Sequence, residues 1–342
     1  MFQPWPAIAS FHKVKTDTLT YEQLSGLRTA TVRYNAKIKL HGTNASIIVL
    51  PDGRVLPQNR SKIISIYDDN YGFAKWVLST ESYWADLRFM SDEIVVVYGE
   101  WCGKGIQSNA AISNIDKQIF VVFAVQYGQC FDQNNSIFVS PNVIKRILSS
   151  TYITEEQNVY VLPWYNTQPI KINFWDDKLG LVVNKMNSMV NCIEQIDPWV
   201  EENFGIRGIG EGLVFYPSSL AVLNGSIRRQ LLSSYIFKVK GQQHQVIKTR
   251  QAVMMNPILA KTLDDFVDLV ATEARMLQAV SETVGGKFDK KYIGPVVAWI
   301  NRDVRKDIEN GEVILPDGFE WKVVSDRLTQ RTKTWYISKI EE

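Results

Sequence analysis

The spacing of the apolar residues changes at about residue 246, and this change limits what the chain can fold into. Before it, short runs of β-branched and aromatic residues recur, among them EIVVVYGEW, QIFVVFAVQYG, EGLVFYP and YIFKVKG. Such runs, bounded by turn residues, are typical of strands. SPNVIKRILSS and the stretch around KMNSMVNCIEQI have a helical pattern instead. We therefore predict an α+β fold for this first region, with mainly antiparallel sheets flanked by helices.

The remainder of the chain follows a helical period. LDDFVDLVATEARMLQAV places five apolar residues on one helical face: Phe266, Leu269, Val270, Ala274 and Leu277. GPVVAWINRDVRKDIEN and SDRLTQRTKTWYISKI continue the pattern. With 342 residues the chain is long enough for about two domains. We predict a larger α+β domain over residues 1–243 and a small all-α domain over residues 244–342.

Composition narrows the class of protein but not its partner. The chain is 45% hydrophobic and 22% charged, as in globular proteins, and its net charge of +2 neither requires nor excludes a nucleic acid. Cys102, Cys130 and Cys192 lie far apart and leave an odd thiol, which favours a reducing compartment. No signal peptide or membrane span is predicted. We expect a monomer in the cytoplasm, or in a host cytoplasm if the chain is viral.

Lysines mark two of the expected strands. KIKLHGTNASI places Lys39, His41 and Asn44 at the point where an apolar run begins. Lys238 and Lys240 alternate in FKVKG, so on a strand their side chains share one face and gain from an anion between them. Taken alone, these two lysines fit a sheet with one solvated face better than an anion site.

Four further residues are ambiguous when each is taken alone. Glu100 follows the apolar run VVVYG and can be a charged strand end. Glu211 precedes LVFYP and can be a simple turn residue, or it can hold a sugar hydroxyl or a hydrated metal ion. Arg60 can pair with a phosphate through two parallel hydrogen bonds. Phe123 suits the core, but an aromatic residue at a strand end is also a stacking platform for a base.

Taken in order, these residues resemble the motifs of the covalent nucleotidyltransferases, which include DNA ligases, RNA ligases and mRNA capping enzymes. The hallmark of that superfamily is a KxxG motif whose lysine accepts a nucleotide. KLHGTN, Arg60, YGE, the run Phe120 to Phe123, EG and KVK occur here in the superfamily's order. KLHGTN and GEWCGKGIQ are similar to the nick-sealing ligases of the RNA ligase 2 type, found in a T-even phage and in trypanosome RNA editing. The resemblance covers residues 33 to 241 and implies a nucleotidyltransferase domain followed by a helical domain.

This resemblance implies an ATP-dependent ligase that joins 3′-hydroxyl and 5′-phosphate ends of RNA, with nicked duplex RNA as the expected partner. Lys39 would carry AMP covalently. Lys238 and Lys240 would disfavour positive charge on Lys39 and cradle the triphosphate. His41 would act in the later steps on RNA. Mg²⁺ or Mn²⁺ would be required, and Glu211 would anchor the hydrated metal.

The resemblance also assigns the nucleotide site. Phe123 would stack on adenine, Glu100 would bind the ribose hydroxyls, and Arg60 and Asn44 would position the nucleotide and the RNA ends. The remaining residues assigned to nucleotide binding are Leu40, Glu211, Lys238 and Lys240. Ile38 and Tyr216 depart from the phage relative, which has a glutamate and a lysine there.

Two alternatives remain open at this point. DNA ligases and capping enzymes usually have a β-rich oligonucleotide-binding domain after the last motif, whereas this tail is helical by its period. A relative that binds RNA without catalysis would not need the lysines, glutamates and Phe123 that are all present. A fold with no active site must explain why polar residues recur at strand ends in the family's order.

Overall fold

The computed structural model describes residues 2–26, 31–128, 132, 134–176, 179–222, 224–241, 263–315 and 319–341. The chain divides into two compact units, one of residues 1–8 and 18–239 and one of residues 9–17 and 240–342. The predicted domain boundary at residues 243 and 244 lies outside the described residues and stays a prediction, and Cys130 lies outside them as well.

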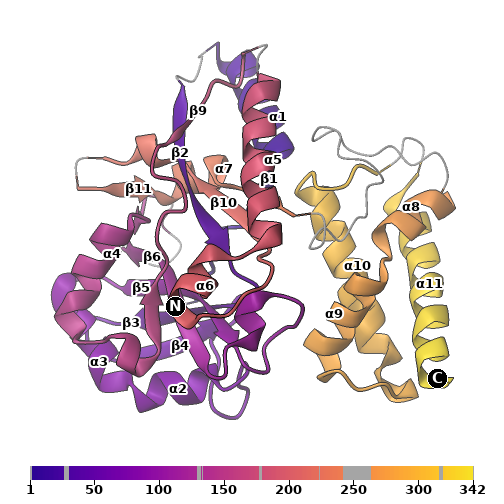
Figure 1. The fold of residues 1–342 in the computed structure, drawn as a ribbon, viewed down its shortest axis with the longest axis horizontal. Coiled ribbons are helices and arrows are strands. Elements are labelled where there is room, and N and C mark those ends of the chain that lie inside the picture. The colour runs from indigo at the N-terminus through magenta and orange to yellow at the C-terminus, as the bar shows by residue number, and fades with distance from the viewer. Residues whose placement is uncertain are drawn as a thin grey trace. The chain divides into compact units, whose positions relative to one another are not determined.

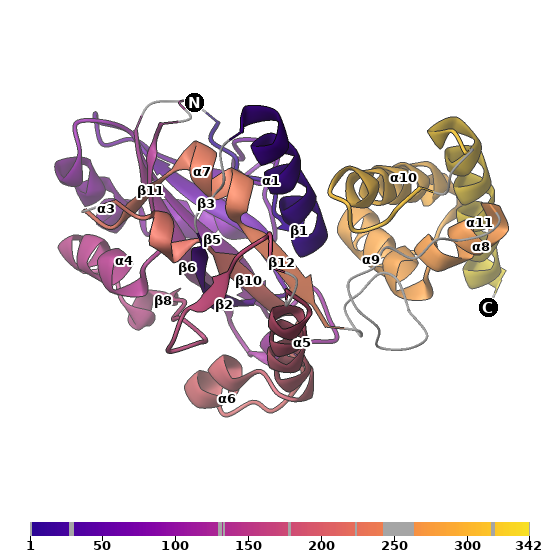
Figure 2. The same cartoon turned by 90° about the horizontal axis from the view of Figure 1, so that it is seen from above.

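Two sheets form the framework of the first unit (Figures 1 and 2). The smaller sheet contains, in spatial order, β12 (Phe237–Lys240), β10 (Gly212–Tyr216), β2 (Val32–Lys39) and β9 (Ile170–Ile172). The larger sheet contains β11 (Ser226–Arg228), β7 (Ser136–Phe138), β6 (Gln118–Tyr127), β5 (Val95–Gly103), β3 (Thr43–Val49) and β4 (Val55–Asn59), and β8 (Val159–Val161) also pairs with β6. The described strand pairs between these elements are antiparallel, except for β6 with β8.

Helices connect and cover these strands. The α-helices up to residue 241 are α1 (Phe11–Ser25), α2 (Phe73–Ser79), α3 (Glu81–Ala85), α4 (Pro141–Leu148), α5 (Leu179–Gln195), α6 (Pro198–Phe204) and α7 (Arg229–Tyr235). Short 3₁₀ turns are η1 (Asp86–Met90), η2 (Ala111–Asn114), η3 (Ser149–Thr151), η4 (Glu155–Gln157) and η5 (Ser218–Leu220). The fold class predicted from the sequence, α+β with antiparallel sheets and flanking helices, is confirmed.

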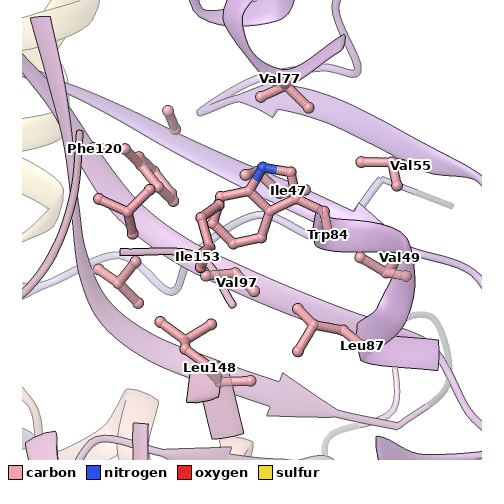
Figure 3. Packing of buried hydrophobic residues seen from close by; sticks show 14 of the residues in the cluster. Ile47, Val49, Val55, Val77, Trp84, Leu87, Val97, Phe120, Leu148 and Ile153 are labelled. Carbon is pink, nitrogen blue, oxygen red and sulfur yellow. The ribbon is translucent and has the colours of Figure 1, made fainter. Parts of the chain in front are cut away.

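One face of the larger sheet carries a large hydrophobic core, covered by α2, α3 and α4. Trp84 of α3 is fully buried there, and Figure 3 shows it surrounded by Ile47, Val97, Phe120 and Leu148. The indole nitrogen of Trp84 donates to the Thr80 side chain at 3.0 Å, so this large residue buries no unpaired polar group. The opposite face of the larger sheet does not contribute to this core and carries Glu100, described below.

The two faces of the smaller sheet have different chemistry. Tyr34, Phe215 and Phe237 lie on one face and pack together, and the rings of Phe215 and Phe237 stack with centroids 4.9 Å apart. Helix α5 lies against this sheet through β10 and β9. Because side chains alternate along a strand, Lys39 of β2 and Lys238 of β12 lie on the other face.

The described residues from 263 on form helices and no strand. They are α8 (Leu263–Val270), α9 (Glu273–Val284), η6 (Lys290–Tyr292), α10 (Ile293–Glu309) and α11 (Trp321–Glu341). Their buried faces share one hydrophobic core. None of the helices in the described part of the chain is both long and apolar enough to cross a membrane.

The predicted helical face that runs through residues 263–280 is wrong in its second half. Thr272 interrupts it, because its side chain accepts a hydrogen bond from a backbone N–H of the next turn at 3.3 Å and so caps α9. A new helix begins there, and the apolar phase starts again. Met276 is buried, whereas Ala274 and Leu277 are exposed.

The core around Trp84 gives a stability prediction. Trp84→Ala removes a fully buried indole and leaves a cavity, so we expect the free energy of unfolding to fall by about 3–5 kcal/mol. Phe89→Ala is the control, because Phe89 is 73% exposed on the neighbouring turn and its loss should change stability by less than about 0.5 kcal/mol. Urea-induced unfolding measures both, and equal effects would contradict the packing described here.

Candidate active site

The chain passes from the smaller sheet to the larger one at the KLHGTN sequence. Strand β2 ends at Lys39 and β3 begins at Thr43. The register of β2 with β10 pairs Lys39 with Gly212, which brings the residue before Gly212 alongside the lysine. Nζ of Lys39 donates to Oε2 of Glu211 at 2.6 Å, and Nδ1 of His41 lies 3.5 Å from the same oxygen. Three residues of the predicted site thus meet at one carboxylate.

Glu100 lies on the neighbouring strand β5, where it pairs in register with Asn44 of β3. Its Oε1 accepts a hydrogen bond from the backbone N–H of Gly42 at 3.2 Å. A Cβ atom at position 42 would lie 2.5 Å from the main-chain oxygen of Trp101 and 2.9 Å from a side-chain carbon of Glu100. The glycine of the KxxG motif therefore has a steric role, since only a residue without a side chain lets the turn pack this closely on β5.

Glu100 has a strongly shifted pKa. Burial is the main cause that raises its pKa to about 7, and the charge of Glu211 raises it further. Lys39, the N–H of Gly42 and Arg60 act in the opposite direction. Although Arg60 is exposed, its positive charge lowers the pKa of Glu100. These charged groups consequently form one electrostatic cluster at the junction of the two sheets.

The ion-pair partner of Lys39 is the carboxylate of Glu211, and the expected effect of Lys238 and Lys240 on its charge stays a prediction. The sequence predicted positive neighbours that disfavour its charge, whereas a carboxylate at 2.6 Å stabilises an ammonium. The Glu211 side chain is only 6% exposed and that of Lys39 is 23% exposed, so the carboxylate is shielded from water more than the amine. Lys238 lies half-buried on the same face of the sheet, on the strand next to β10. Lys240 begins the second unit and is described with it.

Phe123 occupies an irregular position in β6. Tyr98 pairs with Ala124 and Gly99 with Val122, so Phe123 is the extra residue of a β-bulge. Bulges change the direction in which a side chain points. The ring faces away from the core around Trp84 and meets the edge of Trp5, with centroids 5.0 Å apart. It is 8% exposed.

The other predicted residues lie close in sequence to this cluster. Leu40 is buried, and Asn44 is half-buried at the start of β3. In the described part of the chain, no group of three His, Cys, Asp or Glu side chains could hold a metal ion by itself. A single carboxylate suits a cation such as Mg²⁺, which completes its octahedral shell with phosphate oxygens and water. Glu211 fits that limited role.

Sequence reasoning missed Lys37 and Asn70. Lys37 is fully buried on β2, and the alternation that paired Lys238 with Lys240 would also have placed it on the face of Lys39. Asn70 donates to the Thr43 hydroxyl at 3.2 Å and so fastens a loop after β4 to the KxxG turn. No local pattern predicts that contact, because it joins residues far apart in the chain.

The raised pKa of Glu100 predicts a pH-dependent stability. The folded chain holds the proton more tightly than the unfolded chain, whose carboxyl has the ordinary value of 4.5, so stability falls as pH rises from about 4.5 to about 7. Glu100→Gln removes this loss. At about pH 8 we expect the free energy of unfolding of the variant to exceed that of the wild type. The shift in pKa sets an upper bound of about 3 kcal/mol on this gain, and the real gain should be smaller because solvent screens a half-buried side chain.

The same comparison at about pH 5 should show little gain, because most of the wild-type Glu100 is then protonated in the folded state. Glu93→Gln is the matched control, since Glu93 is exposed just before β5. Urea unfolding of the three proteins across this pH range makes the comparison. A Glu100→Gln gain that is the same at both pH values would contradict the assignment.

Known proteins were compared with this chain. Structures of the Naegleria gruberi RNA ligase are similar to it at 14% identity: a variant with ATP and Mn has a TM-score of 0.46, over 71% of this chain and 58% of that one. A variant with AMP and Mn has a TM-score of 0.42, over 71% of this chain and 57% of that one. The chain therefore spans less than two thirds of the length of those ligases. No curated protein matches it.

A family model gives the clearest result. The model described as RNA ligase matches residues 33–240, which is more than half of the chain. That span begins on β2 just before Lys39 and ends with β12, so it includes Glu100, Phe123 and Glu211. The chain belongs to the RNA ligase family.

Proposed function

We propose that this protein is an ATP-dependent RNA ligase of the RNA ligase 2 type, which seals a 3′-hydroxyl to a 5′-phosphate through a lysyl-AMP intermediate. The observation that carries the proposal is the amine of Lys39, 2.6 Å from Glu211. His41 and Glu100 lie around it where the two sheets meet. One Naegleria gruberi ligase variant was solved with ATP and Mn and another with AMP and Mn. For this chain we propose ATP with Mg²⁺ or Mn²⁺.

In the first step, the neutral amine of Lys39 attacks the α-phosphorus of ATP. A phosphorus–nitrogen bond forms, the bond to the bridging oxygen breaks, and pyrophosphate leaves. Glu211 holds the ammonium form beside it in the resting protein, so the amine must give up a proton to water or to this carboxylate before it can attack. Glu211 would hold a divalent cation, which would supply positive charge to the phosphates and to the transition state.

In the second step, an oxygen of the RNA 5′-phosphate attacks the same phosphorus. The phosphorus–nitrogen bond breaks, and the lysine nitrogen takes up a proton as it leaves. In the third step, the 3′-hydroxyl attacks the RNA phosphorus, loses its proton, and releases AMP. We assign His41 to proton transfer in these later steps; its Nδ1 lies 3.5 Å from the carboxylate that also binds Lys39, which supports a position next to the reacting groups.

The other proposed roles follow from position. Glu100, whose pKa lies near neutrality, accepts hydrogen bonds from the ribose hydroxyls. The ring of Phe123 stacks on adenine. Arg60 is exposed at the end of β4 and is available to a phosphate of the nucleotide or of the RNA. Leu40, Asn44 and Glu211 complete the contacts around the nucleotide. Lys238, on the face of Lys39, and Lys240 bind its phosphates.

Nicked duplex RNA is the proposed substrate, bound with the help of the helical residues that follow the first unit. DNA ligases and capping enzymes are the second candidate, and they were expected to have a β-rich domain in this place. The described residues from 263 on contain helices only, which favours the RNA ligase. Comparing nicks in RNA and DNA duplexes tests this choice, and equal or faster sealing of DNA would reverse it.

Replacing Lys39 tests the proposed intermediate. Lys39→Ala should lower transfer of label from α-labelled ATP to the protein by more than about 10³-fold, because no other amine occupies its place. Lys39→Arg keeps a cation beside Glu211 but not a nucleophile, so it should also form no adduct while melting like the wild type. Lys75→Ala, at an exposed site on α2, should keep full activity. A normal adduct on Lys39→Ala would refute the proposal.

Replacing His41 separates the early step from the later ones. His41→Ala should form the lysyl adduct within about threefold of the wild-type rate and lower nick sealing by about a hundredfold or more, as expected for loss of a proton-transfer group. His12→Ala, the matched control outside the site, should change neither. Both steps are followed by denaturing electrophoresis with labelled ATP and labelled RNA. Unaltered sealing by His41→Ala would remove this residue from the mechanism.

A further inference from the structure

Lys37 is a buried lysine to which the proposed reaction gives no role. It is 0% exposed on β2, two residues before Lys39, so both side chains leave the same face of the strand. No carboxylate among the described residues forms an ion pair with it, and burial lowers the pKa of its amine well below the usual range. A desolvated ammonium costs folding free energy, so this position calls for a functional reason.

The surroundings of Lys37 hold its amine in one place. Nζ lies 4.9 Å from the ring centroid of Trp164 and 5.4 Å from that of Tyr216, and the two rings meet at 63°. Such contacts stabilise a cation more when water is excluded. Nζ also donates to the main-chain oxygen of Phe123 at 2.7 Å. Since Lys37 belongs to the smaller sheet and Phe123 to the larger one, this hydrogen bond joins the two sheets.

The oxygen of Phe123 is available because of the bulge in β6. Phe123 has no partner in the registers that join β6 to β5, β7 and β8. A buried carbonyl group without a hydrogen bond is costly, and Lys37 supplies the missing donor. On the other side, the edge of Trp5 meets the phenyl ring of Phe123. The backbone and the ring of this residue are therefore fixed from different directions.

We propose that Lys37 is a positioning residue for nucleotide binding: by holding the main chain of the bulge, it fixes the Phe123 ring relative to Lys39. The inference rests on the proposed function, in which Phe123 supports the base and Lys39 attacks the α-phosphorus. Lys37 lies about 7 Å along the strand from Lys39, so one strand carries both the nucleophile and the support of the base platform.

The test is a double-mutant cycle on the Michaelis constant for ATP in adduct formation. Lys37→Met keeps the length of the side chain but removes its donor and charge, and Phe123→Leu removes the aromatic face. We expect Lys37→Met to raise the Michaelis constant about tenfold and to change the maximal rate less than about threefold. The double variant should be no worse than Phe123→Leu alone, because both changes act through one ring.

A second substrate tests whether the effect passes through the base. With ribose triphosphate that lacks a base, the wild type and Lys37→Met should have Michaelis constants within about twofold of each other, since there is no ring to stack. Lys117→Met is the matched control, because Lys117 also lies against a ring, that of Tyr160, at 5.7 Å but is exposed. It should behave like the wild type with both substrates.

Lys37→Arg covers the case in which Lys37→Met does not fold. Arginine keeps a charged donor and stacks on aromatic rings, so a cooperatively melting Lys37→Arg should bind ATP within about threefold of the wild type. The inference is overturned if folded Lys37→Met has an unchanged Michaelis constant, if the two changes add, or if folded Lys37→Arg binds ATP tenfold more weakly. Absence of any adduct on the wild type would instead overturn the proposed function.

Discussion

The antiparallel pairing of β2 with β10 is the constraint on which the site depends. Its register sets Lys39 opposite Gly212 and so brings the amine to Glu211. A slip of one residue would turn every side chain of β2 to the other face. On that other face Phe215 stacks on Phe237, so apolar packing on one side holds the register that the charged side requires. Stability and chemistry are thereby separated onto the two faces of one sheet.

Several polar side chains are buried on the face of the larger sheet that lies opposite the core around Trp84. The Gln58 amide donates to the Ser46 hydroxyl at 2.6 Å, and the Arg229 guanidinium donates to the Gln126 amide oxygen and to the main-chain oxygen of Pro4. Each of these groups has a partner, and a satisfied network of this kind rigidifies what it joins. The N-terminal segment is fastened to the sheet in this way, and Trp5 is thereby held against Phe123.

The sequence predicted the longer strands, because runs such as those of β5 and β6 have few alternative structures in a chain of this composition. It did not predict the three-residue strands β7, β8, β9 and β11. It also predicted the residues that meet at Glu211, through the order of the motifs. It did not predict which charge would lie beside Lys39, since an ion pair between strands distant in the chain leaves no local pattern. It missed the break at Thr272 because the apolar period continues through the capping residue. It also missed the burial of Lys37, because lysine is a residue type that is usually exposed.

The bulge at Phe123 makes the length of β6 matter more than its composition. Exchanging one β-branched residue for another between Gln118 and Val122 leaves the direction of the phenyl ring unchanged. Deleting a single residue there would restore an unbroken ladder with β5 and turn the ring into the core around Trp84. Members of the RNA ligase family that have this bulge should therefore differ in the residue types of the strand while keeping the same number of residues between its first residue and the bulge.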